Sequence, residues 1–136
     1  MEEKGLLLEE TLKTTLAAVE GLSGRVCPVV DIQKSAGPLA VYEQQDESQE
    51  HTVDGPSGLY SAVFRIHVIH GAYQKMRLLA EQVKGAVQAL RQSRIGALQI
   101  EEVTVKLASP DLYESHIQQY RRTYQATIQY QIKEDM

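Results

Sequence analysis

The sequence predicts an α+β fold, a mostly antiparallel sheet of four to five strands packed against two helices. Two stretches repeat apolar residues every three or four positions, which is the spacing of one helix face. Other stretches alternate apolar and polar residues, as half-buried strands do. With 136 residues, 43% of them hydrophobic, the chain can bury one core, and we expect a single domain over residues 1–136.

The first helix is expected over residues 3–20, where apolar residues fall on one face at Leu8, Leu12, Leu16 and Val19. Gly21 follows, and glycine readily takes the left-handed conformation that ends helices. Residues 25–31 contain valines around Pro28, which cannot donate a hydrogen bond to a sheet. We therefore expect only a weakly extended segment there.

A strand is predicted over residues 39–45, and a central strand over residues 59–69 with its apolar face at Tyr60, Ala62, Phe64, Ile66 and Val68. Between them lies a polar stretch that contains Asp-Gly-Pro and almost nothing able to enter a core. We expect a long loop at about residues 44–57.

The second helix is predicted after Gly71, where the apolar residues are Tyr73, Met76, Leu79, Val83, Val87 and Leu90. In the next strand the apolar residues Leu98, Ile100, Val103 and Val105 change phase at Glu101-Glu102, which indicates a β-bulge. The last strand alternates most strictly, with one face formed by Arg122, Tyr124, Ala126, Ile128, Tyr130 and Ile132.

Composition disfavours several classes of protein. The 14 Lys and Arg against 18 Asp and Glu give a net charge of −4, so no basic field attracts nucleic acid, and no sequence-specific nucleic acid partner is expected. The single cysteine, Cys27, allows no internal disulfide and is expected to act as a small hydrophobe. Glu2 and Glu3 near the start, followed by a short leucine run, do not fit a secretory signal or membrane span, so a soluble intracellular protein is expected.

No constellation of catalytic or cofactor-binding residues stands out. The glycines fit no phosphate-binding loop, and His67 and His70 would need other distant segments to form a metal site. The carboxylate pairs Glu101-Glu102 and Asp111 with Glu114 are expected to be solvated, and Arg121-Arg122 places one charge on each face of a strand. We predict no catalytic residue, no cofactor and no metal.

Several local patterns that follow one another along the chain nevertheless resemble those of a known family. They are Gly24-Arg25-Val26-Cys27-Pro28, Gly37-Pro38-Leu39-Ala40-Val41-Tyr42, Thr52-Val53-Asp54-Gly55-Pro56-Ser57-Gly58-Leu59, Leu79-Ala80-Glu81-Gln82-Val83, and Asp111-Leu112-Tyr113-Glu114 before Tyr120-Arg121-Arg122. Together they resemble the small tail-completion or tail-terminator (head-tail joining) proteins of long-tailed phages and prophages. The acidic, Gln-rich stretch from Gln44 to Thr52 departs from that pattern.

The resemblance implies a non-enzymatic virion assembly protein that caps the finished tail tube as a homo-oligomeric ring, sixfold in related systems, and joins it to the head connector. Its partners would be further copies of itself, the tail tube protein and head-connector proteins, with no membrane. It would act in the host cytoplasm during assembly and then at the head-tail junction of the virion. A head-closure or neck protein on the portal side is the alternative, and a small enzyme using His67 and His70 with Glu101 or Asp111 is a rival from another class.

The residues predicted to contact partners or neighbouring subunits are Glu47, Glu50, Asp54, Gly55, Pro56, Ser57, Arg121, Gln125 and Gln129. Residues 54–58 form either a contact point or a plain turn. The polar face of the last strand either meets a partner or simply meets water. Residues 44–52 lack an apolar anchor, so we expect a loop that orders against a neighbour or serves only as a spacer.

Overall fold

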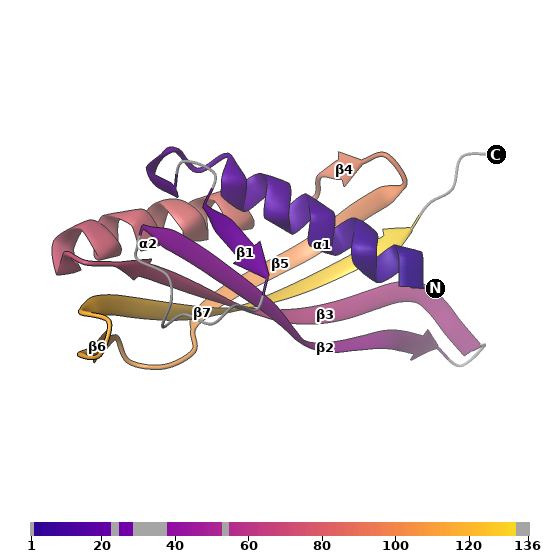
Figure 1. Cartoon of the computed structure of the whole chain (residues 1–136). Helices are drawn as coiled ribbons and strands as arrows, with labels where there is room; N and C mark the ends of the chain where they lie inside the picture. Colours follow the sequence, from indigo (N-terminus) through magenta and orange to yellow (C-terminus); the bar gives the residue numbers. More distant parts are fainter. Residues whose placement is uncertain (1, 23–24, 29–37, 53–54, 133–136) are drawn as a thin grey trace.

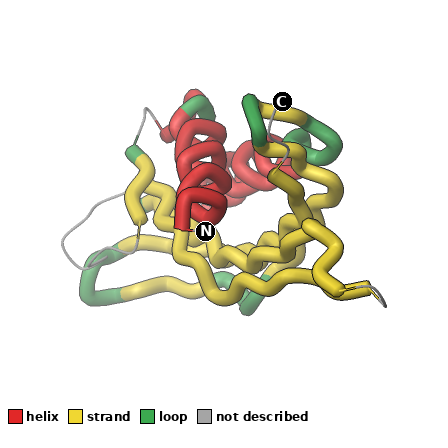
Figure 2. Tube along the Cα trace, turned by 90° about the vertical axis from the view of Figure 1, so that its right-hand side faces the viewer, coloured by secondary structure: helices red, strands yellow, loops and turns green. Residues whose placement is uncertain are grey.

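A computed structural model describes residues 2–22, 25–28, 38–52 and 55–132, with side chains for 7–22, 25–28, 38–48 and 59–132. Two helices lie on one face of a curled seven-stranded sheet (Figures 1 and 2). The elements in chain order are α1 (Glu2–Ala17), the 3-10 turn η1 (Glu20–Leu22), β1 (Val26–Pro28), β2 (Leu39–Thr52), β3 (Gly55–His70), α2 (Tyr73–Gln88), β4 (Arg94–Ile95), β5 (Leu98–Leu107), β6 (Leu112–Glu114) and β7 (Gln119–Ile132).

The core lies between the helices and the sheet and follows the predicted periodicities. Leu8, Leu12 and Leu16 of α1 are at most 1% exposed, as the four-residue steps predicted. The buried face of α2 is Met76, Leu79, Ala80, Val83 and Val87, and it meets apolar faces of the sheet at Ala62, Phe64, Ile66, Val68, Tyr124, Ala126, Ile128 and Tyr130. Both predicted helices and the α+β class are confirmed.

The strand order is β1-β2-β3-β7-β5-β4, and the short strand β6 pairs with β7 beyond the end of the β5 ladder. All neighbouring strands are antiparallel except β1 and β2, which are parallel. The expected four to five strands are therefore too few. The unexpected strands β4 and β6 have only two and three residues, too few for alternation to show in the sequence.

The expected loop at about residues 44–57 is wrong for the described residues, because 44–52 and 55–57 form the paired outer halves of β2 and β3. Glu47 pairs with Ala62, and Thr52 pairs with Gly55 close to the turn. Backbone hydrogen bonds make this pairing, so it needs no apolar side chains on β2. Two register irregularities, at Gln44/Asp46 and Gln49/His51, also break the alternation that would have revealed a strand.

The predicted bulge in β5 is confirmed by a register shift between Ile100 and Glu102. Because one extra residue enters the strand there, Leu98 and Ile100 before it and Val103 after it are all buried on the helix side. On the opposite face, a second small apolar cluster joins Leu39, Val41 and Ile69, with the half-buried Cys27 packed against it. This contact agrees with the hydrophobic role expected for the cysteine.

Candidate assembly surfaces

The face of the sheet turned away from the helices, here called the open face, carries three of the predicted contact residues. Arg121, Gln125 and Gln129 alternate with the buried residues of β7, so they share this face. Opposite Gln125 and Thr127 on β5 stand Lys106 and Thr104. The middle of the open face is thus an array of amides and hydroxyls, and Gln125 is flanked there by the exposed Lys106 on β5 and Arg65 on β3.

His67, Thr123 and Glu43 form a polar cluster on the same face, nearer the start of β2. Nδ1 of His67 lies 2.8 Å from Oγ1 of the buried Thr123, and its Nε2 lies 3.5 Å from Oε1 of Glu43. Burial lowers the pKa of His67, as do Arg121 and Arg65, against the opposing effect of Glu43. The ring is therefore held mainly in its neutral form at pH 7.

Arg121 is not a free charge. Its NH2 group lies 2.9 Å from Oε1 of Glu114 on β6, and both side chains are largely buried. Nε2 of the exposed His116 lies 3.6 Å from the other carboxylate oxygen. The predicted contact role of Arg121 would thus require a partner to meet an arginine already paired within its own chain.

Asp111 and Arg122 form a bidentate ion pair on the helix side, with distances of 2.8 and 2.9 Å. The hydrogen bonds from Arg122 lower the pKa of Asp111, and those to Asp111 raise the pKa of Arg122. The hydroxyl of Tyr73 donates to the same carboxylate at 3.2 Å, and Arg77 donates to that hydroxyl at 3.2 Å. The carboxylate expected to be solvated instead ties the start of α2 to β7.

Around this ion pair lies a cluster of side chains that we call the tyrosine patch: Tyr73, Arg77, Leu78, Tyr113 and Tyr120. The Tyr120 ring centroid lies 5.4 Å from that of Tyr73 and 4.7 Å from that of Tyr113. The guanidinium carbon of Arg77 lies 6.0 Å from the centre of the Tyr73 ring. The patch was not predicted from the sequence, although Tyr113 and Tyr120, near the two ends of the Asp111–Arg122 segment, indicated aromatic residues there.

The predicted hairpin residues lie far from Arg121. Glu47 is exposed but its carboxylate accepts a 2.9 Å hydrogen bond from the hydroxyl of the buried Tyr130. Glu50 lies in β2, and Gly55, Pro56 and Ser57 lie in β3, while Asp54 falls outside the described residues. The structure therefore divides the predicted contact residues between the hairpin and the open face and does not join them into one site.

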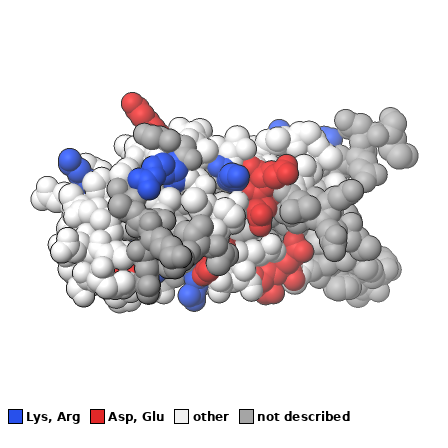
Figure 3. All heavy atoms as spheres, viewed as in Figure 1, with Lys and Arg blue, Asp and Glu red and all other residues white. Residues whose placement is uncertain are grey.

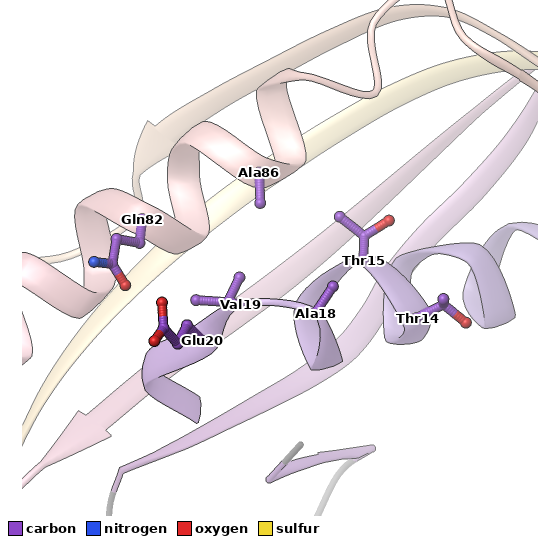
Figure 4. A pocket seen from close by; sticks show the side chains of 7 residues that line it. All are labelled: Thr14, Thr15, Ala18, Val19, Glu20, Gln82 and Ala86. Atoms are coloured by element: carbon purple, nitrogen blue, oxygen red, sulfur yellow. The ribbon is translucent and has the colours of Figure 1, made fainter. Parts of the chain in front are cut away.

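A groove runs between the helices on the other side of the molecule. Its larger part has a volume of about 610 Å³ and is lined by Thr14, Thr15, Ala18, Val19, Glu20, Gln82 and Ala86 (Figure 4). A second part of about 360 Å³ shares Thr14 and Thr15 and continues toward Ile95. Methyl and hydroxyl groups dominate the lining, and Glu20 and Glu10 are its ionisable members.

The residues of the rival enzyme hypothesis do not meet in the described part of the chain. His67 contacts Thr123 and Glu43, His70 accepts a hydrogen bond from the Ala72 amide, and Asp111 pairs with Arg122. In the ranges given above, no group of three or more His, Cys, Asp or Glu side chains could hold a metal ion. No described helix has the length and apolar character needed to cross a membrane.

No protein-family model matches the sequence, and no curated protein matches it either. The fold, in contrast, is similar to that of a chain in a solved structure described as the virion of a native gene transfer agent particle. The TM-score is 0.60 at 15% sequence identity, and the match covers 88% of this chain and 91% of the other. At this identity the match establishes a shared fold over nearly the whole length of both chains.

Proposed function

We propose that the chain is a structural protein of a phage or phage-like particle that caps the tail tube and joins it to the head connector as a ring of identical copies. The observation that carries the proposal is the fold shared over 88% of the chain with a virion protein. The tail-completion resemblance in the sequence narrows the role to the head-tail junction.

Features of the described surface support an assembly role. A ring needs two different patches on each copy that fit one another and repeat until the ring closes. The chain offers distinct surfaces for this, namely the open face with Gln125 and Gln129, the β2–β3 hairpin and the tyrosine patch. Six copies would follow the rings of related systems, and the finished particle would hold the protein at its head-tail junction.

The direct experiment mixes purified protein with purified tail tubes and images the tube ends by electron microscopy. We expect a density cap on wild-type tube ends. Gln129→Arg, on the open face, should reduce capping without changing the melting temperature, whereas Lys84→Glu on α2 serves as a charge-changing control that should still cap. Tube ends left bare by the folded wild-type protein would refute the capping role.

The second candidate is a head-closure or neck protein on the portal side, because the shared fold is that of a virion protein and does not select one side of the joint. Copurification separates the two roles. A terminator is retained by tail tubes, and a neck protein is retained by portal complexes. Retention by portal complexes alone would replace the first proposal with the second.

A further inference from the structure

The tyrosine patch exposes more large apolar surface than is usual for a face that meets only water. Tyr73 is 41% exposed, Leu78 67% and Tyr113 52%, although all three are large apolar side chains. Tyrosine and arginine are also the residue types enriched where binding energy concentrates in protein interfaces. The patch therefore has the composition of a docking surface.

The patch is also held rigid before any partner arrives. Tyr120 contacts the rings of both Tyr73 and Tyr113, and the hydroxyl of Tyr73 is fixed between Asp111 and Arg77. A preformed surface loses little side-chain freedom on binding, so more of its contact energy becomes affinity. This rigidity favours a defined partner over non-specific adhesion.

Its chemistry selects an acidic partner. A hollow of about 400 Å³ is lined by Tyr73, Gln74, Arg77, Leu78 and Glu81, and the exposed Lys75 lines the adjoining hollow. The Asp111 carboxylate is already neutralised by Arg122, and Glu81 lies 3.9 Å from the same guanidinium. Arg77, Lys75 and the hydroxyls of Tyr113 and Tyr120 can then donate to carboxylates of an incoming segment.

The outer half of β2 is such a segment. Residues 44–48 are exposed in five consecutive positions, and β2 contains no Lys or Arg while it carries Glu43, Asp46 and Glu47. Within the described residues, β1 covers the outer edge of β2 only at residues 40–42. The exposed carboxylate of Asp46 therefore lies on the part of β2 that no other described strand but β3 contacts.

The two surfaces cannot meet within one molecule. β3 leads from Val63, the partner of Asp46, to His70, which pairs with Tyr120 of the patch, and these seven residue steps span roughly 23 Å at about 3.3 Å per residue. Figure 1 shows the hairpin and β6 at opposite ends of the molecule. Figure 3 shows both acidic and basic side chains on the face of the molecule seen in Figure 1.

We propose that the tyrosine patch of one copy binds the acidic outer half of β2, centred on Asp46, in the next copy. The contact joins two different patches of identical chains, so it repeats head to tail and can close a ring. It rests on the proposed ring function and supplies that ring with a specific interface. The carboxylate of Asp46 meets Arg77 and Lys75, while the tyrosine rings cover the strand.

Charge exchange tests this contact. The association of the full chain is measured without tail tubes by analytical ultracentrifugation and native mass spectrometry. Arg77→Glu and Asp46→Arg should each weaken association by about tenfold or more, the order of a lost interfacial charge contact. The double variant Arg77→Glu/Asp46→Arg should recover it, because the opposite charges again face each other.

Mixing provides a second test that a merely structural role would not pass. An equimolar mixture of the Arg77→Glu and Asp46→Arg variants should associate. The acidic patch of the first variant then meets the basic strand of the second, and the unchanged patch of the second meets the unchanged acidic strand of the first. Lys84→Glu, a matched reversal on α2 outside the patch, should associate like wild type. Thermal melting of every variant identifies any that fail to fold. The double variant Tyr113→Phe/Leu78→Ser then replaces a variant that fails, and it should also weaken association.

The outcomes separate this inference from the capping function. Wild-type protein that stays monomeric at millimolar concentration, single variants that associate normally, or a double variant and mixture that fail to recover would each overturn the inference. If charge exchange behaves as expected but tube ends stay bare, the interface stands and the capping proposal falls. If tubes are capped by all the variants alike, only the interface is overturned.

Discussion

The hydroxyl of Tyr130, a residue fully buried in β7, donates a 2.9 Å hydrogen bond to Oε2 of Glu47 in the outer half of β2. Glu47 pairs with Ala62, which pairs in turn with Ile128, so its side chain points to the helix side of the sheet. An acidic residue thus fastens the outer part of the edge strand to the core. The Tyr60 ring, whose centroid lies 5.5 Å from that of Tyr130, stacks against the same phenol.

Removing this hydroxyl should loosen the hairpin. Tyr130→Phe is expected to lower the free energy of unfolding by about 1.5 kcal/mol, typical for a hydrogen bond to a charged group. Chemical denaturation measures the change, and Glu47→Gln, which keeps an acceptor, should cost less. An unchanged free energy of unfolding in Tyr130→Phe would show that this hydrogen bond does not stabilise the fold.

The packing of α2 gives a prediction about the core. Leu79 is 5% exposed, and Leu79→Ala should cost roughly 2 to 5 kcal/mol through lost burial and the cavity it leaves. A Cβ atom at Gly21 would lie 2.8 Å from Cδ1 of Leu79, so Gly21→Ala should destabilise the wild-type protein. In the Leu79→Ala background the same change should cost much less, because the obstructing methyl group is gone. Denaturation midpoints of the two single variants and the double variant measure the coupling, and additive losses would contradict the contact.

His67 predicts a pH dependence of stability. Its pKa is lowered in the folded protein, chiefly by burial, so the unfolded chain takes up a proton more readily as the pH falls below about 6.5. The contribution of His67 is present above that pH and is lost as the pH falls toward the lower folded value. Melting temperatures between pH 7 and 5 should therefore fall less steeply for His67→Gln than for wild type, and parallel curves would exclude this role.

The ion pair of Asp111 and Arg122 affects the stability of the fold at a more acidic pH than His67 does. The pKa of Asp111 is lowered by hydrogen bonds from Arg122, so its stabilising contribution is present above its usual value near 4 and is lost below it. Asp111→Asn should cost roughly 1.5 to 3 kcal/mol at pH 7, the range for a hydrogen bond to a charged group, since it leaves a largely buried guanidinium underpaired. Urea denaturation at pH 7 and pH 3 should show a difference between the variant and wild type that shrinks in acid.

The bulge in β5 predicts how two single-residue deletions in this strand affect stability. Deleting Glu101 removes the extra residue and leaves Leu98, Ile100, Val103 and Val105 in simple alternation on the core face. Deleting Thr104 instead turns the following residues to the wrong face. The first deletion should retain a cooperative melting transition at a higher temperature than the second, and the opposite order would mean that the bulge itself is needed for the fold.

The sequence predicted those elements in which burial on one face alone decides the conformation. In β7, buried Tyr124, Ala126 and Ile128 alternate with polar residues, and in α1 the four-residue steps mark the buried leucines. The outer half of β2 could not be predicted in this way, because residues 44–48 are exposed and the pairing with β3 is made by the backbone. The conformation of such a strand depends on its neighbour and not on its own side chains.

The candidate surfaces were predictable only in part. Gln125 and Gln129 do share one face of the sheet, as alternation requires. Asp111 and Arg122 are separated by 11 positions, and the β6–β7 turn brings them together, so no local pattern indicates their pairing. The tyrosine patch likewise combines residues from α2, β6 and β7, which only the folded chain places side by side.

The acidity of β2 has a consequence for the protein at high concentration. An exposed sheet edge invites the same edge of another molecule to pair with it, which is a route to insoluble aggregates. Two copies of this edge would bring Asp46 and Glu47 against like charges, and the side chain of Glu47 turned inward resists a flat approach. The acidic side chains of β2 thereby discourage the non-specific stacking that would precipitate the protein.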